Sequence, residues 1–299
     1  MRQFSSKVKS EIITSSLDTK LDKLAFLSSY VRVAATIGLV GKNKSVSITS
    51  DKKLLEFLDV LLDDVTVGAD VPTDNYDKNN GTELKITGDN ATNLLMILKI
   101  FSQHKNGDLE YQPSIHSDFL ENSPIATLKG FFVGCGSLTI TNNFHLEFNF
   151  TNGYLASDCQ MLLSNLGINA KLLARDERFV VYLKKAENIA NTLTMLGAEN
   201  SALKIVHESI TRETSSLINR RLNCDMYNIE KHIASANSQI EAIKSLEKNG
   251  KLKTLSPILQ ETAKLRLDNP DSTLAELAEL AKVSKSGFKH RLDKLMQLV

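Results

Sequence analysis

The sequence contains no tryptophan, only five prolines and only three cysteines among its 299 residues. Cys135, Cys159 and Cys224 lie far apart and form no CxxC pair, so the sequence predicts neither a disulfide framework nor a thiolate zinc site. No run of 18 apolar residues occurs, which argues against a membrane-spanning helix. The first residues, MRQFSSKVKSEI, lack the apolar stretch of a signal peptide. We therefore expect a cytoplasmic protein with no membrane partner.

An excess of charge of one sign is also missing, since 36 basic residues face 35 acidic ones. This balance argues against a chain that coats nucleic acid or an anionic membrane over its whole length. The balance nevertheless hides a division: residues 209–299 hold 15 basic and 11 acidic residues, a net +4, and residues 1–208 carry a net −3. In residues 282–299 five lysines and arginines face one acid, Asp293. A small basic module is typical of a DNA-reading domain, and a solvated charged helix face is the alternative.

Hydrophobic residues make up 42% of the chain, enough to bury a core, and their spacing predicts an order of elements that occurs twice. Each order begins with a helix and continues through a strand, a helix, a strand and a helix, displaced by about 100 residues. The elements predicted in the first half are helix 23–38, strand 46–49, helix 51–64, strand 83–87 and helix 90–102. Those in the second half are helix 124–134, strand 145–150, helix 155–166, strands 171–174 and 178–183, and helix 186–197.

This recurrence predicts an α+β domain with two pseudo-symmetric halves, about 20–103 and 124–199, although a coincidental repeat is the alternative. A further helix is expected over 4–16, and the acidic, asparagine-rich stretch 70–83 is expected to be a solvated connection. Strand patterns stop near residue 200. We therefore expect an N-terminal domain over 1–205, a linker helix over 206–224 and an all-helical C-terminal domain over 225–299.

The segment 272–298 has the pattern of two short helices joined by a tight turn. Thr273 followed by Glu276 predicts a capping box at the first helix, and Ser284 predicts the N-cap of the second. Phe288 begins an i, i+4, i+7 apolar face on the second helix. Lys282 occupies the turn position where a left-handed conformation favours glycine, at a cost of about 1 kcal/mol for lysine. These features predict a helix-turn-helix.

In a helix-turn-helix the second helix enters the major groove of DNA, so its outward side chains are the predicted contacts. At 100° per residue Ser286, Lys289 and His290 face away from Phe288, while Lys285 lies in the first turn. The backbone amides behind Ser284 are suited to a phosphate. The predicted DNA-binding set is Ser284, Lys285, Ser286, Lys289, His290, Arg291 and Lys294, with Arg291 and Lys294 assigned to phosphates.

Three stretches together resemble the WhiA family of bacterial regulators. They are LSSYVRVAATIG (27–38), LKGFFVGCGSLT (128–139), and RLNCDMYNIEK (221–231) followed by LRLDNPDSTLAELAEL and SKSGFKHRLDKL. The resemblance implies a degenerate LAGLIDADG homing-endonuclease domain followed by a helix-turn-helix, and it covers nearly the whole chain. Within it the run from Arg220 to Cys224, together with Asn228, is assigned to the interdomain linker, with a packed helix as the alternative.

In active endonucleases of this fold, each motif helix ends with an acidic residue that binds the catalytic metals. Here the resemblance places Ala34 and Cys135 at those two positions. Alanine offers no ligand, and a thiol is the wrong ligand for Mg²⁺. The same cysteine is interpreted as a packing thiol rather than a nucleophile. The sequence therefore predicts no enzyme, no catalytic residue, no metal and no cofactor.

The resemblance also implies a role. It suggests a transcriptional regulator linked to cell division and chromosome segregation, and to sporulation in spore-formers, which binds promoter sites in double-stranded DNA at the nucleoid. Another transcription factor or RNA polymerase is the partner considered for the N-terminal domain. The alternatives are a non-catalytic interaction scaffold for division proteins and a residual DNA endonuclease.

Overall fold

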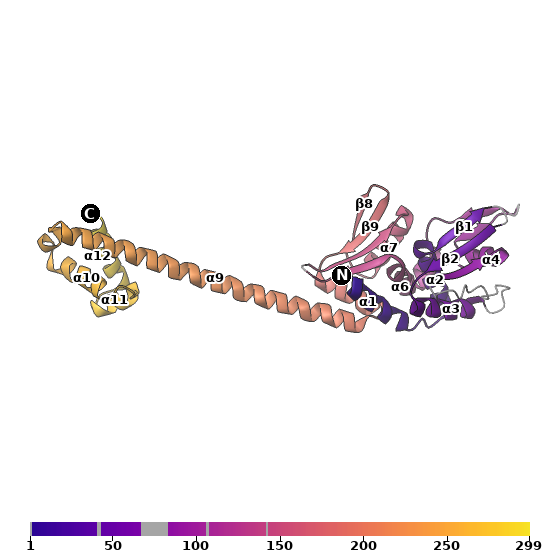
Figure 1. The fold of residues 1–299 in the computed structure, drawn as a ribbon, viewed down its shortest axis with the longest axis horizontal. Coiled ribbons are helices and arrows are strands. Elements are labelled where there is room, and N and C mark those ends of the chain that lie inside the picture. The colour runs from indigo at the N-terminus through magenta and orange to yellow at the C-terminus, as the bar shows by residue number, and fades with distance from the viewer. Residues whose placement is uncertain (1, 41–42, 67–82, 106–107, 142) are drawn as a thin grey trace. The chain divides into compact units, whose positions relative to one another are not determined.

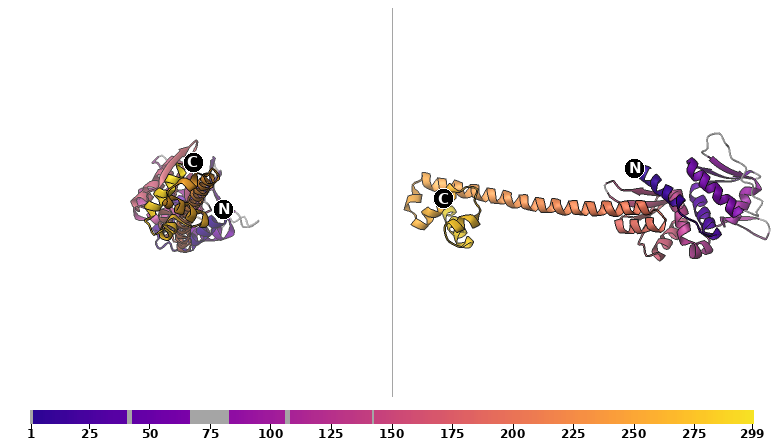
Figure 2. Two further views of the ribbon diagram at one scale, coloured as in Figure 1. Left: turned by 90° about the vertical axis from the view of Figure 1, so that its left-hand side faces the viewer. Right: turned by 90° about the horizontal axis from the view of Figure 1, so that it is seen from below.

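The structure is a computed structural model that describes residues 2–40, 43–66, 83–105, 108–141 and 143–299 (Figure 1). The predicted connection at 70–83 thus lies almost wholly outside the described residues. Internal contacts divide the chain into two units, Met1–Thr211 and Arg212–Val299, and each is considered by itself. Strands are confined to the first unit, and the regular elements described in the second unit are all helical (Figure 1 and Figure 2). None of the described helices has the length and hydropathy needed to cross a membrane.

The first unit contains two antiparallel sheets, one in each predicted half, and a small hairpin between them. The first sheet has the order β1-β2-β3 and the second the order β6-β7-β9-β8, while β4 pairs with β5. The strands are β1 (Thr36–Val40), β2 (Asn43–Thr49), β3 (Glu83–Thr87), β4 (Phe101–Gln103), β5 (Leu109–Tyr111), β6 (Gly136–Thr139), β7 (His145–Phe150), β8 (Lys171–Arg175) and β9 (Arg178–Leu183). Alternation explains their one-sided burial: Leu146, Phe148 and Phe150 of β7 are all buried.

Helices cover these sheets and join the two halves. They are α1 (Arg2–Thr14), α2 (Lys20–Ala34), α3 (Lys52–Thr66), α4 (Asp89–Ile97), α5 (Ser117–Asn122), α6 (Pro124–Cys135), α7 (Gly153–Asn165) and α8 (Ala186–Met195). The order α2-β1-β2-α3-β3-α4 is repeated as α6-β6-β7-α7-β9-α8, with β8 added in the second half. The α+β class and the duplicated arrangement predicted from the sequence are therefore confirmed.

Two of the predicted helices end earlier in the structure than in the prediction. The helix predicted over 23–38 ends at Ala34, because Ala35 has an extended backbone (φ −89°, ψ 150°) and Thr36 begins a strand. The helix predicted over 90–102 ends at Ile97, and Phe101 begins β4. Strand β6, which follows α6 and pairs with β7, is not among the predicted elements. The short elements α5, β4 and β5 were not predicted.

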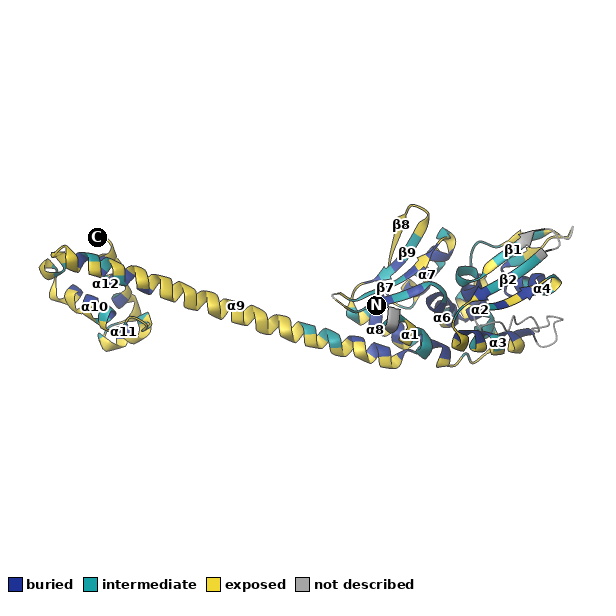
Figure 3. Ribbon diagram, viewed as in Figure 1, coloured by how far each residue is buried: buried dark blue, intermediate teal, exposed yellow. Residues whose placement is uncertain are grey.

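The second unit is built on the C-terminal part of α9 (Glu199–Lys248), a helix of 50 residues that begins in the first unit. It continues through the 3-10 helix η1 (Lys251–Thr254), α10 (Pro257–Asp268), α11 (Leu274–Leu280) and α12 (Lys285–Met296). Its core consists of Ile243, Leu246, Leu259, Ala263, Leu277, Ala278, Phe288, Leu292 and Leu295. The middle of α9 is exposed, apolar residues such as Leu217, Leu222 and Ile229 included (Figure 3). This helix runs through the predicted linker over 206–224.

Candidate nucleic-acid interface

Helix α11 begins with the predicted capping box. The Thr273 hydroxyl accepts the Glu276 backbone N–H at 3.3 Å, and the Thr273 backbone N–H donates to Glu276 Oε2 at 2.7 Å. The two bonds satisfy amides that have no partner inside the helix. Hydrogen bonds from Thr273 hold the pKa of the Glu276 carboxyl below its usual value. The start of α11 is therefore fixed by two side chains three residues apart.

The turn between α11 and α12 adopts the conformation that the sequence suggested. Lys282 has φ +54°, in the left-handed region where glycine is favoured. Its neighbour Val283 donates its backbone N–H to the Ala278 carbonyl at 2.9 Å, which closes the turn. Ser284 then caps α12 by accepting the Gly287 N–H at 3.1 Å. The turn length and both cap assignments are confirmed.

Helix α12 is anchored by its apolar face. Phe288 and Leu292 are fully buried and Leu295 is 1% exposed, as their spacing predicted. They pack with Leu277 and Ala278 of α11 in the core of the second unit. Because three consecutive turns are fixed from one side, the orientation of the opposite face of α12 is determined.

The predicted DNA-binding residues occupy that opposite face. Ser284, Lys285, Ser286, Lys289, His290 and Lys294 are exposed, whereas Arg291 is half-buried. Within the described part of the chain, none of the four cations of this set is joined to an acid by an ion pair. The Ser284 and Ser286 hydroxyls lie 3.2 Å apart and can share a proton. The face thus offers free cationic and hydroxyl donors to an anionic surface.

A buried arginine that sequence reasoning missed supports the start of α11. Arg266 of α10 is 3% exposed, and its Nη1 donates to the Ser272 carbonyl at 2.6 Å. Burial lowers the pKa of its guanidinium, with Asp271 acting in the opposite direction. Its place in a run of alternating charged and apolar residues gave no signal of this role. Residues 220–224 and Asn228, which the sequence assigned to the interdomain linker, lie exposed on α9. The alternative of a packed helix therefore does not describe them.

The motif helices α2 and α6 contact each other closely, and glycines of α6 lie at that contact. A Cβ added at Gly130 would overlap the Phe26 carbonyl and the Ser29 hydroxyl, and one added at Gly134 would overlap Val33. Glycine is therefore required on α6 for the two backbones to approach this closely. The contact brings together the ends of the two helices, where Ala34 lies beside Gly134.

The two positions that the resemblance matches to the metal-binding acids of active endonucleases, Ala34 and Cys135, carry no acid. Ala34 is half-buried, and burial raises the pKa of the Cys135 thiol to about 12, so the sulfur is protonated at neutral pH. Among the described residues no group of three or more His, Cys, Asp or Glu side chains could hold a metal ion. With these side chains, the helix ends offer no carboxylate pair to a divalent metal.

Comparison with known proteins gives consistent family and fold matches. Family models for the WhiA C-terminal HTH domain and the WhiA LAGLIDADG-like domain match residues 218–299 and 125–215. A probable cell division protein WhiA of Clostridium acetobutylicum is 33% identical over 99% of this chain and 96% of its own length. One from Clostridium beijerinckii is 31% identical over 99% and 97%. The crystal structure of full-length WhiA from Thermotoga maritima has a TM-score of 0.53 at 19% identity, covering 97% of this chain and 95% of that one. At that identity the structure supports the fold alone.

Proposed function

The chain belongs to the WhiA family, and from that premise we propose that it is a DNA-binding transcription regulator linked to cell division. The observation that carries the proposal is the outward face of α12. Three lysines, one arginine and one histidine stand there without an acidic partner among the described residues, opposite an apolar face that fixes the helix. Unpaired cations on a rigid helix suit the phosphates and base edges of a major groove.

Individual roles follow from position along α12. Ser286, Lys289 and His290 are proposed to reach base edges because they face away from Phe288, and Lys285 because it lies in the first turn of the helix. Arg291 and Lys294 lie nearer the edges of that face and are proposed to contact phosphates. The Ser284 cap leaves the amides of the first turn directed outward, where they suit one further phosphate.

The first unit is proposed to be a non-catalytic domain. Ala34 and the protonated thiol of Cys135 leave the ends of α2 and α6 without the carboxylates that two-metal hydrolysis needs. We propose that this domain, over residues 1–205, binds a transcription factor or RNA polymerase. Residues 206–224 would link it to the DNA-binding domain over 225–299. In the cell the protein would act in the cytoplasm at the nucleoid, with a role that extends to chromosome segregation.

Binding of the full chain to duplex DNA tests the proposal. Genomic fragments selected by the wild-type protein are measured by fluorescence anisotropy across a range of salt, beside the double variant Lys285→Ala/Lys289→Ala. Because both lysines are assigned to base edges, the double variant should lose about 1–3 kcal/mol of binding free energy for each lysine removed. The double variant Lys251→Ala/Lys264→Ala removes the same charge from exposed positions outside α12 and is the matched control.

Equal affinity and equal salt slope for the α12 variant and the wild type would refute the assignment to DNA. An interaction scaffold for division proteins would then be favoured. A separate measurement tests the proposal that the first unit is non-catalytic: plasmid DNA is incubated with the full chain and Mg²⁺. No cleavage is expected, and cleavage that disappears in a Cys135→Ser variant would contradict the proposal.

A further inference from the structure

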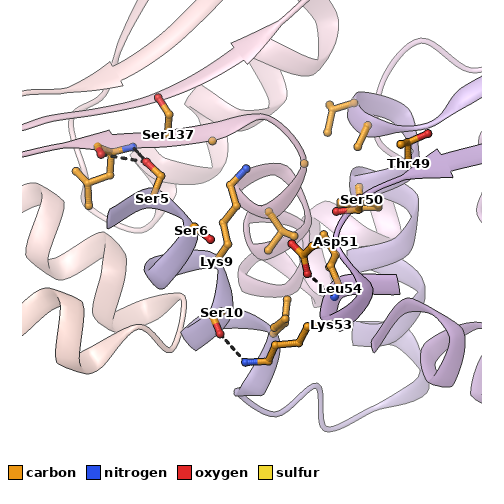
Figure 4. A pocket seen from close by; sticks show the side chains of 18 of the residues that line it. Ser5, Ser6, Lys9, Ser10, Thr49, Ser50, Asp51, Lys53, Leu54 and Ser137 are labelled. Atoms are coloured by element: carbon orange, nitrogen blue, oxygen red, sulfur yellow. Dashed lines mark hydrogen bonds between the residues drawn. The ribbon is translucent and has the colours of Figure 1, made fainter. Parts of the chain in front are cut away.

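A polar hollow of about 900 Å³ lies in the first unit beside the ends of the two motif helices. Its walls come from α1, from the C-terminal ends of α2 and α6, from the connection between β2 and α3, and from β6 (Figure 4). Segments that are more than 100 residues apart in the sequence therefore meet around one space. Ala34 and Gly134 are part of its wall, so the hollow opens beside a position that the resemblance matches to a catalytic acid of active endonucleases.

Hydrogen-bond donors dominate the lining. Eight hydroxyl side chains contribute to it: Ser5, Ser6, Ser10, Tyr30, Thr49, Ser50, Ser137 and Thr139. Two lysines, Lys9 and Lys53, face one acid, Asp51. Hydroxyls and ammonium groups together are suited to an oxygen-rich anion. The lining includes no histidine and no cysteine, so it does not offer a transition-metal site.

Several of these groups already have partners, and this singles out Lys9. Lys53 donates to the Ser10 hydroxyl, and Asp51 accepts the Leu54 backbone N–H at 3.1 Å. Ser137 donates to Glu147 Oε1 at 3.1 Å. By contrast, the half-buried Lys9 extends from α1 into the hollow, and no hydrogen bond or ion pair joins its ammonium to a described residue (Figure 4).

A half-buried ammonium without an anion is unfavourable, because it has lost water without gaining a partner. Burial lowers the pKa of Lys9, and Cys135 and Asp51 only partly oppose the shift. An anion in the hollow would supply the missing partner. A cavity of this size also falls in the range of sites that bind small organic molecules, about 300–1,000 Å³. Ile13, Leu54 and Leu138 give it an apolar side for the rest of such a molecule.

We propose that this hollow binds a small phosphate-bearing molecule of the size of a nucleoside monophosphate, with the phosphate against Lys9 and the hydroxyls around it. A phosphate monoester presents several oxygens to donors arriving from different directions, as α1, β6 and the connection before α3 supply here. This ligand site uses none of the residues proposed to bind DNA on α12. It gives the first unit a binding activity in place of the lost metal site.

Isothermal titration of the full chain with AMP, GMP, CMP and UMP tests the proposal, with adenosine and inorganic phosphate as reference probes. At least one nucleotide should bind with one site per chain. Removing the phosphate, as in the matching nucleoside, should weaken binding by about tenfold or more. Lys9→Ala should weaken nucleotide binding by a similar factor, whereas Lys7→Ala, an exposed lysine of α1 outside the hollow, should leave it unchanged.

A second variant covers the case in which Lys9→Ala fails to fold. Ala34→Asp places a negative charge in the wall of the hollow and should also weaken nucleotide binding. Absence of binding by all four nucleotides at millimolar concentration would overturn the proposal, as would unchanged affinity in both variants. Inorganic phosphate binding as tightly as the nucleotides would overturn the assigned ligand size. If short duplex DNA displaced the bound nucleotide completely, the hollow would be part of a DNA-binding surface, and the proposal of a small-molecule site would be wrong.

Discussion

The helix pair α2–α6 and the helix pair α11–α12 both place two helices in contact, but they leave different surfaces behind. In the first pair, glycines on α6 allow close backbone approach, and the facing stretches 25–31 of α2 and 126–133 of α6 are buried. In the second, larger side chains such as Phe288 fill the contact, and the opposite face of α12 is exposed and basic. The first contact joins two halves of a domain, while the second fixes the orientation of a surface that remains available to a partner.

The largest expected effect is at the glycine contact. Gly130→Ala should lower the free energy of unfolding of the first unit by about 3 kcal/mol, because the new methyl group overlaps the Phe26 carbonyl, which cannot rotate away. Gly134→Ala meets only the end of the Val33 side chain and should cost about 1 kcal/mol. Native-state hydrogen exchange reports the two units separately. Equal losses of unfolding free energy in the two variants would contradict the claim that Gly130 is required by its contact with the Phe26 backbone.

The capping box of α11 should give a smaller, pH-dependent effect confined to the second unit. Thr273→Ala removes the cap and should cost about 1 kcal/mol of stability at neutral pH. The pKa of Glu276 is lowered in the folded state, so its contribution is present above the unfolded pKa and is lost as pH falls through the folded pKa. In hydrogen exchange from neutral to acidic pH, the wild type should lose stability that the Glu276→Gln variant does not lose. Parallel profiles would show that the carboxylate contributes nothing.

The smallest effect is expected in the turn. Lys282→Gly relieves a left-handed conformation and should stabilise the second unit by about 1 kcal/mol at most. Lys282→Ala removes the same charge but keeps the strained φ, so it serves as the matched control. The difference in thermal stability between the two variants measures the free-energy cost of the left-handed backbone at position 282. If both variants behave alike, the turn of the helix pair stores no strain.

Local patterns in the sequence predicted much of this structure. The cap residues Thr273 and Ser284, the spacing of Phe288 with Leu292, and the left-handed Lys282 all depend on neighbours within a few positions. The duplication was also predictable, because apolar spacing repeats on both sides of residue 110. The family assignment required longer stretches, of which RLNCDMYN and SKSGFKHRLDKL are the specific parts.

What sequence reasoning missed depends on distant contacts. The predicted helix 23–38 overlaps the first residues of strand Thr36–Val40, because short apolar runs do not distinguish a helix from a strand and pairing with β2 decides the conformation. Arg32 gave no signal of its role, yet its Nη2 donates to the Lys99 carbonyl at 2.7 Å and links α2 to the segment after α4. The hollow around Lys9 was equally hidden, because α1 and β6 approach one another only in the folded chain.

The Ser5 hydroxyl affects how strand β6 can interact with other copies of the chain. Strand β6 lies at the border of its sheet, with β7 on one side only. On its open side Ser5 donates to the Leu138 carbonyl at 3.0 Å and accepts the Leu138 N–H at 2.7 Å. A single serine thus takes the two bonds that a neighbouring strand would make. Exposed sheet borders are templates for intermolecular pairing, so α1 protects the domain against aggregation through β6.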